Sequence, residues 1–380
     1  MTLLQLFSKF RIQNSKPASS SLDRQAWRRL RRNPLAVVSM VVIGLFAMVA
    51  ILGYLITPDH TPFCNQQYLE LATLKPGSKA TFLHLYSSPK LGEVDAEGGR
   101  RSVSPLSFHT MLYGEPLPYT AIPIKEYCYA RDSIVAVPYH GETLVVPAEQ
   151  AQVRQRTFIL GTDAFGRDVL SMLMIGSRVS LSVGFIAIII ALLIGVTLGA
   201  LAAYYGGWVD NLIMWVVNVV WSIPTVLLVI AITFALGKGF WQIFVAVGFT
   251  MWVDIARVVR GEVLSIREKE YVEATRALGY STFRTIFRHI LPGTVGAVVV
   301  VAASNFASAI LLEAGLSFLG IGVQPPMPSW GRMVKENYGY LLLDSAYLAL
   351  LPGAAIMVIV LAFMLLVGGI RDVLDVRSAE

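Results

Sequence analysis

Residues that could do chemistry are few in this sequence, and they are scattered. The histidines occur singly, as His60, His84, His109, His140 and His289. The chain has only two cysteines, and neither has a neighbour at metal-ligand spacing, so zinc is not expected. The HExxH motif of zinc proteases and the GxxxxGK[ST] loop that binds nucleotide phosphates do not occur in the sequence. These patterns predict no catalytic residue, no metal and no cofactor in this chain.

Two segments partly match known functional motifs, but the order of their residues excludes those functions. Residues 161–168, GTDAFGRD, combine two carboxylates with two glycines, but the alternating oxygen ligands and terminal Glu of a calcium loop are missing. Residues 315–319, GLSFL, begin like the G-x-S-x-G nucleophile elbow of hydrolases. Leu319 stands at the second glycine and no strand precedes the serine, so an esterase is not expected.

The composition indicates an integral membrane protein. Hydrophobic residues make up 55% of the 380 residues and charged residues 15%, against about 25% charged in ordinary soluble domains. The net charge of +6 would suit nucleic acid only if the basic residues shared one folded surface. They lie beside apolar segments instead, so the lipid bilayer is the expected partner and nucleic acid is not.

Six apolar segments are predicted to be membrane-spanning helices. They cover residues 35–56, 179–203, 212–236, 240–255, 295–312 and 347–367. At about 1.5 Å per residue the first is roughly 33 Å long, enough to cross a hydrocarbon core of about 30 Å. No small-residue cleavage pattern follows this segment, so it is not expected to be a signal peptide.

Basic residues predict which side of the membrane each connection occupies. The run from Trp27 to Arg32 holds four arginines directly before the first span and places the N-terminal segment 1–34 in the cytoplasm. Seven Lys or Arg residues lie between Arg257 and Pro292, whereas the turn on the other side has Lys238 alone. The loop 257–293 is therefore predicted to be cytoplasmic, and six spans return the tail 371–380 to the same side.

Residues 57–160 are polar and rich in proline, and they are expected to form a small extracytoplasmic insertion. The segments Ala80–Tyr86 and Ser133–Val146 have the Val, Ile and Tyr content of short strands. Cys64 and Cys128 both fall here, where a disulfide could persist. Two alternatives stay open: a disulfide that restricts a long loop, worth roughly 4 kcal/mol in the chain-entropy model, or two free thiols.

Polar residues interrupt the third and fifth spans. Asn218, Ser222 and Pro224 fall inside the third, and Asn305 near the middle of the fifth. A proline frees a backbone carbonyl that must be satisfied inside protein or in a wet cavity. These four residues are candidates to line a translocation path, and an ordinary packed kink at Pro224 is the alternative.

The stretch 270–292, EYVEATRALGYSTFRTIFRHILP, is strongly polar between two apolar spans. Its pattern predicts two short helices that meet at a bend at Gly279, because glycine ends helices and Ser281 or Thr282 can cap the next one. The apolar faces are predicted to hold Tyr271, Ala274, Thr275 and Leu278 in the first helix, and Phe283, Ile286, Phe287 and Ile290 in the second. A solvated loop on lipid headgroups is the alternative.

The order of residues in this stretch resembles the cytoplasmic coupling loop of binding-protein-dependent ABC import permeases. Glu273-Ala274 begin that pattern, Gly279 follows at the required offset, and Leu291-Pro292 close it. Thr275 and His289 depart from the usual Ala and Ile. Thr is small enough to leave a close helix approach intact, and His-Ile-Leu-Pro is similar to the version found in the oligopeptide and dipeptide branch.

Two more segments carry the resemblance. LGTDxxGRD at 160–168 resembles a signature of peptide-permease C-type subunits, formed here by Gly161, Thr162, Asp163, Gly166, Arg167 and Asp168. Asp163, Arg167 and Asp168 are expected to fix a tight turn at the outer membrane surface. The run from Glu313 to Gly331 resembles the outer loop after the fifth span of peptide and nickel permeases.

The resemblance implies an all-α membrane protein with the six-helix type I ABC importer permease fold, in a bacterial inner membrane, with residues 161–370 as its core. A homologous second permease would complete the pathway, two cytoplasmic ATPases would bind ATP and Mg²⁺, and an extracytoplasmic substrate-binding protein would deliver the cargo, so this chain would not itself be an enzyme. The residues implied to contact one ATPase are Tyr271, Glu273, Ala274, Thr275, Arg276, Leu278 and Gly279.

Other functions fit the residues less well. Peptides lead among the cargoes, with nickel chelates or glycans as alternatives. A membrane enzyme would need acid–base or metal residues at one depth, and Asn218, Asn305 and terminal acids are all that is seen. A sensor or scaffold that displays residues 57–160 is the remaining alternative.

Overall fold

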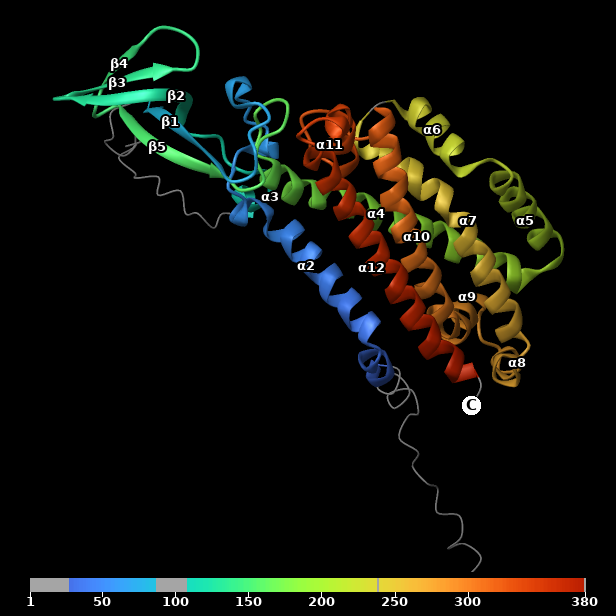
Figure 1. The fold of residues 1–380 in the computed structure, drawn as a ribbon. Coiled ribbons are helices and arrows are strands. Elements are labelled where there is room, and N and C mark those ends of the chain that lie inside the picture. Colours follow the sequence, from blue (N-terminus) through green and yellow to red (C-terminus); the bar gives the residue numbers. More distant parts are fainter. Residues whose placement is uncertain (1–26, 87–107, 238, 379–380) are drawn as a thin grey trace, which may run out of the picture.

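The structure is a computed structural model that describes residues 27–86, 108–237 and 239–378. The first 26 residues of the predicted N-terminal segment and Lys238 of the turn used for orientation lie outside the described residues. The described chain forms an elongated helical bundle with a small β-sheet beyond one end (Figure 1).

Five helices in the described part of the chain are long and apolar enough to cross a membrane. They are α2 (Pro34–Ile56), α4 (Val169–Tyr205), α7 (Phe240–Arg267), α10 (Leu291–Leu319) and α12 (Tyr347–Ser378). Each contains one of the predicted apolar segments and extends beyond it, α2 by a single residue. Helical hydrogen bonding does not stop where hydropathy falls, so the polar ends stay helical outside the apolar window.

The predicted third span is broken. Residues 212–236 divide into α5 (Gly207–Trp221) and α6 (Thr225–Leu236), whose axes differ by 93° across the three residues between them. Pro224 precedes α6 with ψ at 125°, and a proline disfavours helical backbone in the residue before it. The predicted span is thus two helices with a sharp bend between them, at the interruption that Ser222 and Pro224 were predicted to cause.

Small residues allow α4 and α7 to pack closely along most of their length. A Cβ atom on Gly195 would lie 2.7 Å from the carbonyl oxygen of Trp252, and one on Gly199 would lie 2.5 Å from that of Ala256. The Gly195–Gly199 pair, four residues apart, thus faces the backbone of α7. Close backbone approach of this kind replaces the hydrophobic driving force that is missing between helices in lipid.

The insertion forms a five-stranded antiparallel sheet in the order β4-β3-β2-β1-β5. The strands are β1 (Ser78–Tyr86), β2 (Tyr119–Ala130), β3 (Ser133–Pro138), β4 (Leu144–Pro147) and β5 (Ala151–Phe158). The segment 133–146, expected to hold short strands and turns, forms the hairpin of β3 and β4, and the segment 80–86 belongs to β1. The sheet lies near the end of α2 and the start of α4 (Figure 1).

Shorter elements complete the described chain. They are two 3-10 turns (Pro62–Cys64 and Leu69–Leu71), α3 (Phe108–Tyr113), α8 (Glu270–Ala277), α9 (Thr282–Arg284), a π-helical turn (Thr285–Ile290), α11 (Trp330–Asn337) and a 3-10 turn (Tyr338–Leu342). Helices α8 and α9 lie at the opposite end of the bundle from α11 (Figure 1).

Cys64 and Cys128 do not form the disulfide offered as one alternative, and both are free thiols. Cys64 is buried at the foot of the insertion, where its Sγ donates to the carbonyl oxygen of Asp59 at 3.1 Å. Cys128 is exposed on the half of β2 that pairs with β3, opposite Val135. The two thiols belong to different parts of the insertion, so the shared polar segment did not bring them together.

Candidate coupling elbow and membrane cavity

The first arm of the elbow is helix α8, which follows α7 after a short break at Glu268 and Lys269. Acidic Glu270 and Glu273 occupy its first turn and Arg276 its last, which matches the polarity of the helix dipole. The helix ends at Ala277, and Gly279 follows its cap with a φ of 73°, the left-handed conformation that glycine adopts without a Cβ penalty. The predicted helix and its glycine stop are confirmed.

The second arm departs from the prediction. Ser281 caps it as expected, with its Oγ accepting from Arg284 N at 3.4 Å. The predicted short helix then continues through the π-helical turn into α10, so residues 282–319 form one long element. Pro292 cannot donate the hydrogen bond that an unbroken α-helix needs, and a widened turn directly before it accommodates this loss.

The side-chain faces of the elbow differ from those predicted. Val272, Ile286 and Ile290 are buried against the bundle. The two phenylalanines point outward instead: Phe283 is 70% exposed, and its ring lies 4.3 Å from that of the half-exposed Phe287. Helical period alone had assigned these phenylalanines to the face of the buried isoleucines. The position of the bundle decides which side of the turn is covered.

The seven residues implied to contact an ATPase lie together on α8 and its C-terminal turn, and six of them are exposed. Leu278 is 71% exposed and Tyr271 is also exposed, with its hydroxyl 3.4 Å from the carbonyl oxygen of His289. Thr275 is the exception, because its side chain is buried and donates to Val272 O at 2.7 Å. Together with the phenylalanines, the elbow presents an exposed apolar surface: Tyr271, Leu278, Phe283 and Phe287.

Charged contacts attach the elbow and its supporting helix to the rest of the bundle. Arg260 of α7 donates to both carboxylate oxygens of Asp210 in α5, each at 2.6 Å. Arg267, the last residue of α7, donates to the carbonyl oxygen of Ala203 near the end of α4 at 2.5 Å. The guanidinium of Arg276 lies over the ring of Tyr204, 5.1 Å from its centroid. The elbow is therefore joined to α4 and, through α7, to α5.

At the other end, the segment 161–168 forms the predicted tight turn. Asp163 Oδ1 accepts from the backbone N–H groups of Phe165 and Arg167 at 2.9 Å, while its Oδ2 accepts from Arg167 Nε at 2.7 Å. Asp168 caps α4 by accepting from Ser171 N at 3.1 Å. Burial alone would lower the pKa of Arg167, but Asp163 and Glu336 raise it above its usual range. Burial raises the pKa of Asp168.

The remaining signature residues support this turn from the backbone side. Thr162 Oγ1 donates to the carbonyl oxygen of Leu71 and accepts from Leu74 N, which ties the turn to the insertion. Gly161 and Gly166 both have positive φ, and a Cβ on Gly166 would overlap the carbonyl group of Tyr68. The partner that the sequence did not indicate is Glu336 of α11, which joins Arg167 from far along the chain.

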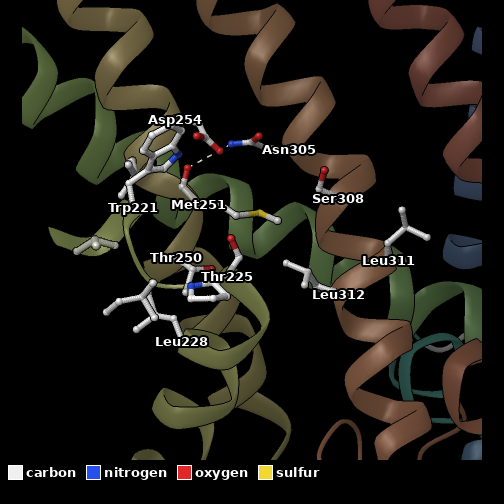
Figure 2. A pocket seen from close by; sticks show the side chains of 14 residues that line it. Trp221, Thr225, Leu228, Thr250, Met251, Asp254, Asn305, Ser308, Leu311 and Leu312 are labelled. Carbon is white, nitrogen blue, oxygen red and sulfur yellow. Dashed lines mark hydrogen bonds between the residues drawn. The ribbon is translucent and has the colours of Figure 1, made fainter. Parts of the chain in front are cut away.

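A cavity of about 490 Å³ lies beside the break between α5 and α6, bounded by α7 and α10 (Figure 2). It is lined by Val220, Trp221, Ile223, Pro224, Thr225, Leu228, Thr250, Met251, Val253, Asp254, Asn305, Ser308, Leu311 and Leu312. Of the four predicted pathway residues, Pro224 and Asn305 line this cavity. Asn218 accepts from Arg257 at 2.8 Å and Ser222 donates to Val219 O at 2.7 Å, both outside the lining.

The sequence analysis identified Asn305 but missed Thr250, Asp254 and Ser308, the other polar residues that α7 and α10 contribute to this cavity. Thr250 and Asp254 are four residues apart in α7, and Asn305 and Ser308 are three apart in α10, so each pair shares a helix face. That spacing was available in the sequence. The sequence did not show that these faces of α7 and α10 meet in the folded protein.

Comparison with known proteins agrees with this geometry. Residues 195–379 match the family model described as binding-protein-dependent transport system inner membrane component, and residues 21–76 match the N-terminal TM domain of oligopeptide transport permease C. The glutathione transport system permease protein GsiD of Pectobacterium atrosepticum is 41% identical over 216 residues, which cover 57% of this chain and 71% of that protein. The chain belongs to the family of binding-protein-dependent transport permeases.

A second relative supports the same assignment. The dipeptide transport system permease protein DppC of Alkalihalophilus pseudofirmus is 39% identical to this permease over 229 residues, or 60% of this chain and 75% of that protein. The permease is thus a multi-pass inner-membrane protein, and its family works with ATPases and substrate-binding proteins. The sheet insertion lies between the two matched ranges, which end at residue 76 and begin again at residue 195.

Two solved ABC transporter structures are similar to part of this chain. An inward-facing form of the MetNI methionine ABC transporter has a TM-score of 0.44 and 21% identity, and covers 54% of this chain and 96% of its own. An amino acid ABC transporter crystallised with histidines has a TM-score of 0.38 and 16% identity, and covers 52% and 91%. The family assignment rests on the sequence relatives.

Proposed function

We propose that this permease forms half of the translocation pathway of an ATP-driven peptide importer. Its elbow would bind an ATPase subunit and transmit the conformational change of that subunit to the membrane helices. The observation that carries the proposal is the exposed apolar surface of Tyr271, Leu278, Phe283 and Phe287 at one end of the bundle. Large apolar side chains exposed together on a short polar segment suit a contact with another protein. Peptides are the proposed cargo because the named relatives transport glutathione and dipeptides.

The connectivity of the elbow supports a mechanical role. Helix α8 follows α7 on one side, and the second arm runs without a break into α10 on the other. Helices α7 and α10 also line the cavity at the α5–α6 break. A rigid movement of the elbow would tilt both helices and change the shape of the cavity between them.

The proposal includes a set of partners. Two cytoplasmic ATP-binding subunits would bind ATP and Mg²⁺, a homologous second permease would complete the pathway, and an extracytoplasmic binding protein would deliver the peptide. Exposed apolar side chains on α5 and α6, such as Trp215 and Leu227, suit the second permease or lipid. The elbow would face the cytoplasm together with both chain termini, in line with the basic residues around it.

The test changes the apolar surface of the elbow and leaves the bundle intact. We expect Leu278→Glu to remain in the membrane, to copurify poorly with the ATPase and to lose most peptide uptake in proteoliposomes. Gly279→Pro should act in the same direction, because proline cannot adopt the positive φ at that position. Gly279→Asn is its matched control, since asparagine tolerates this conformation.

Leu342→Glu is the second control, because Leu342 is 97% exposed in the 3-10 turn that follows α11. It should leave ATPase copurification unchanged. If Leu278→Glu and Gly279→Pro both kept normal uptake and normal ATPase copurification, the elbow would not be the coupling element.

A further inference from the structure

The cavity beside the α5–α6 break holds an acidic side chain near the middle of helix α7, where its apolar segment 240–255 ends. Asp254 belongs to α7, and Figure 2 shows its carboxylate directed toward the amide of Asn305 on α10. Ser308 lies one turn further along α10 and also lines the cavity. An ionisable residue at membrane depth is costly and most often marks a substrate or ion path.

Asp254 has no hydrogen bond or ion pair with any other described residue. The nearest basic residue along α7 is Arg257, one turn away. Its guanidinium lies over the ring of Trp221, 3.9 Å from the centroid, and donates to Asn218 Oδ1 at 2.8 Å. Arg257 thus contacts the end of α5 and makes no ion pair with Asp254, although its charge acts on the Asp254 carboxylate, which lines the cavity.

The neighbouring polar groups mainly offer acceptors. Asn305 Nδ2 donates one of its two N–H groups to Met251 O at 3.2 Å, and its Oδ1 remains an acceptor. Ser308 Oγ donates to Ser304 O at 3.3 Å and Thr250 Oγ1 donates to Val247 O at 2.8 Å, so both hydroxyls keep lone pairs. A carboxylate with amide and hydroxyl oxygens around it is suited to a cation that carries several N–H donors.

We propose that Asp254, with Asn305 and Ser308, forms a subsite for the primary ammonium group of the transported molecule. This inference rests on the proposed peptide cargo and adds which part of it is recognised. A primary ammonium carries one charge and three donors, which match the carboxylate, the amide oxygen and the hydroxyl. The described residues hold no group of three or more His, Cys, Asp or Glu side chains, so a metal ion is less well matched.

Position on moving elements gives the subsite a role in transport. Asp254 is on α7 and Asn305 and Ser308 are on α10, the two helices that lead to the elbow. A movement that separates these helices would divide the acceptors between them. The ammonium group would then lose part of its binding site, which favours release.

The test uses the complete importer in proteoliposomes with three radiolabelled probes: Ala-Ala, N-acetyl-Ala-Ala and N-acetyl-Lys-Ala. The first has an N-terminal ammonium, the second has none, and the third has one on its side chain. We expect the wild-type assembly to transport Ala-Ala roughly tenfold to a hundredfold faster than N-acetyl-Ala-Ala, the range for a hydrogen-bonded charged group. In Asp254→Asn that ratio should fall close to one, with N-acetyl-Ala-Ala uptake retained.

The matched control is Glu262→Gln, which removes one acid from α7 outside the cavity lining. It should keep the wild-type ratio. Uptake of N-acetyl-Lys-Ala that depends on Asp254 would show that the subsite accepts a side-chain ammonium as well as an amino terminus. A preference that persists in Asp254→Asn would overturn the subsite and leave the importer proposal standing. If the wild-type assembly took up none of the three probes, the peptide proposal would fail and the subsite with it.

Discussion

Arg167 and Glu336 are 169 positions apart in the chain and form an ion pair of 2.5 Å at the end of the bundle near the inserted sheet. Glu336 also accepts from Arg332 Nε at 2.7 Å, so α11 contributes both an acid and a base to this network. Asp163 completes it by pairing with Arg167 from within the turn. The network joins the start of α4 to α11, which packs against α12.

Breaking this network should destabilise the permease. Asp163 and Arg167 are almost fully buried, and removal of one partner leaves the other charge without full compensation. We expect Asp163→Asn to lower the free energy of unfolding by about 3 kcal/mol, seen as a lower Tm of the purified protein in detergent. Glu142→Gln, at an exposed position in the turn between β3 and β4, should leave Tm unchanged. An unaltered Tm in Asp163→Asn would show that the turn is held by its backbone bonds alone.

Packing between α4 and α7 should respond sharply to one added methyl group. Gly199→Ala would place Cβ about 2.5 Å from the carbonyl oxygen of Ala256, too close without movement of a backbone. Such overpacking costs about 1 to 3 kcal/mol. Gly261→Ala in α7 is the control, because nothing lies within 4 Å of the new atom and alanine favours helix. Thermal unfolding in detergent should separate the two, and equal Tm values would argue against close packing at Gly199.

The two thiols should differ in reactivity without any reductant. Cys128 is exposed, whereas Cys64 is buried and its burial raises the pKa of its thiol, which keeps it protonated and unreactive. A maleimide reagent should therefore modify Cys128 of the native protein in detergent within minutes. Cys64 should react only after denaturation. A requirement for prior reduction before either thiol reacts would instead demonstrate a disulfide.

The sheet should lose stability at acidic pH because of His84. Burial, with Arg154 and Arg156 nearby, lowers the pKa of His84, which stacks on Tyr119 with ring centroids 4.0 Å apart. In the unfolded chain the His84 imidazole has its ordinary pKa of about 6.5. Below that pH the unfolded chain therefore binds more protons at this histidine than the folded chain does. The contribution of neutral His84 to the stability of the folded sheet is complete above a pH of about 6.5. It is lost as the pH falls below that value.

Hydrogen exchange measures this effect. Corrected for intrinsic rates, protection of the β1 amides should decrease from pH 7.5 to pH 5, and His84→Gln should remove most of that decrease. The same pH response in wild type and variant would assign it to another group.

Some elements were predictable because their causes are local. The membrane spans follow from apolar length, and the α8 stop follows from Gly279, whose conformation the chain needs wherever the bundle lies. The cap at Ser281 and the turn around Asp163 likewise depend on residues a few positions apart. The outward direction of the Phe283 side chain has no local cause. Helical spacing placed it with Ile286, and the covering bundle separated them.

The sequence by itself determined that this chain is a membrane protein with a polar elbow between its fourth and fifth apolar segments, since composition and short-range patterns carry that information. The resemblance of its motifs to those of a known family indicated a permease. Tertiary structure alone decided that α5 and α6 turn by 93°, that Cys64 and Cys128 stay apart, and that Asp254 meets Asn305 in one cavity. The physical reason is that helix period shows which residues share a face, while only packing shows which faces meet.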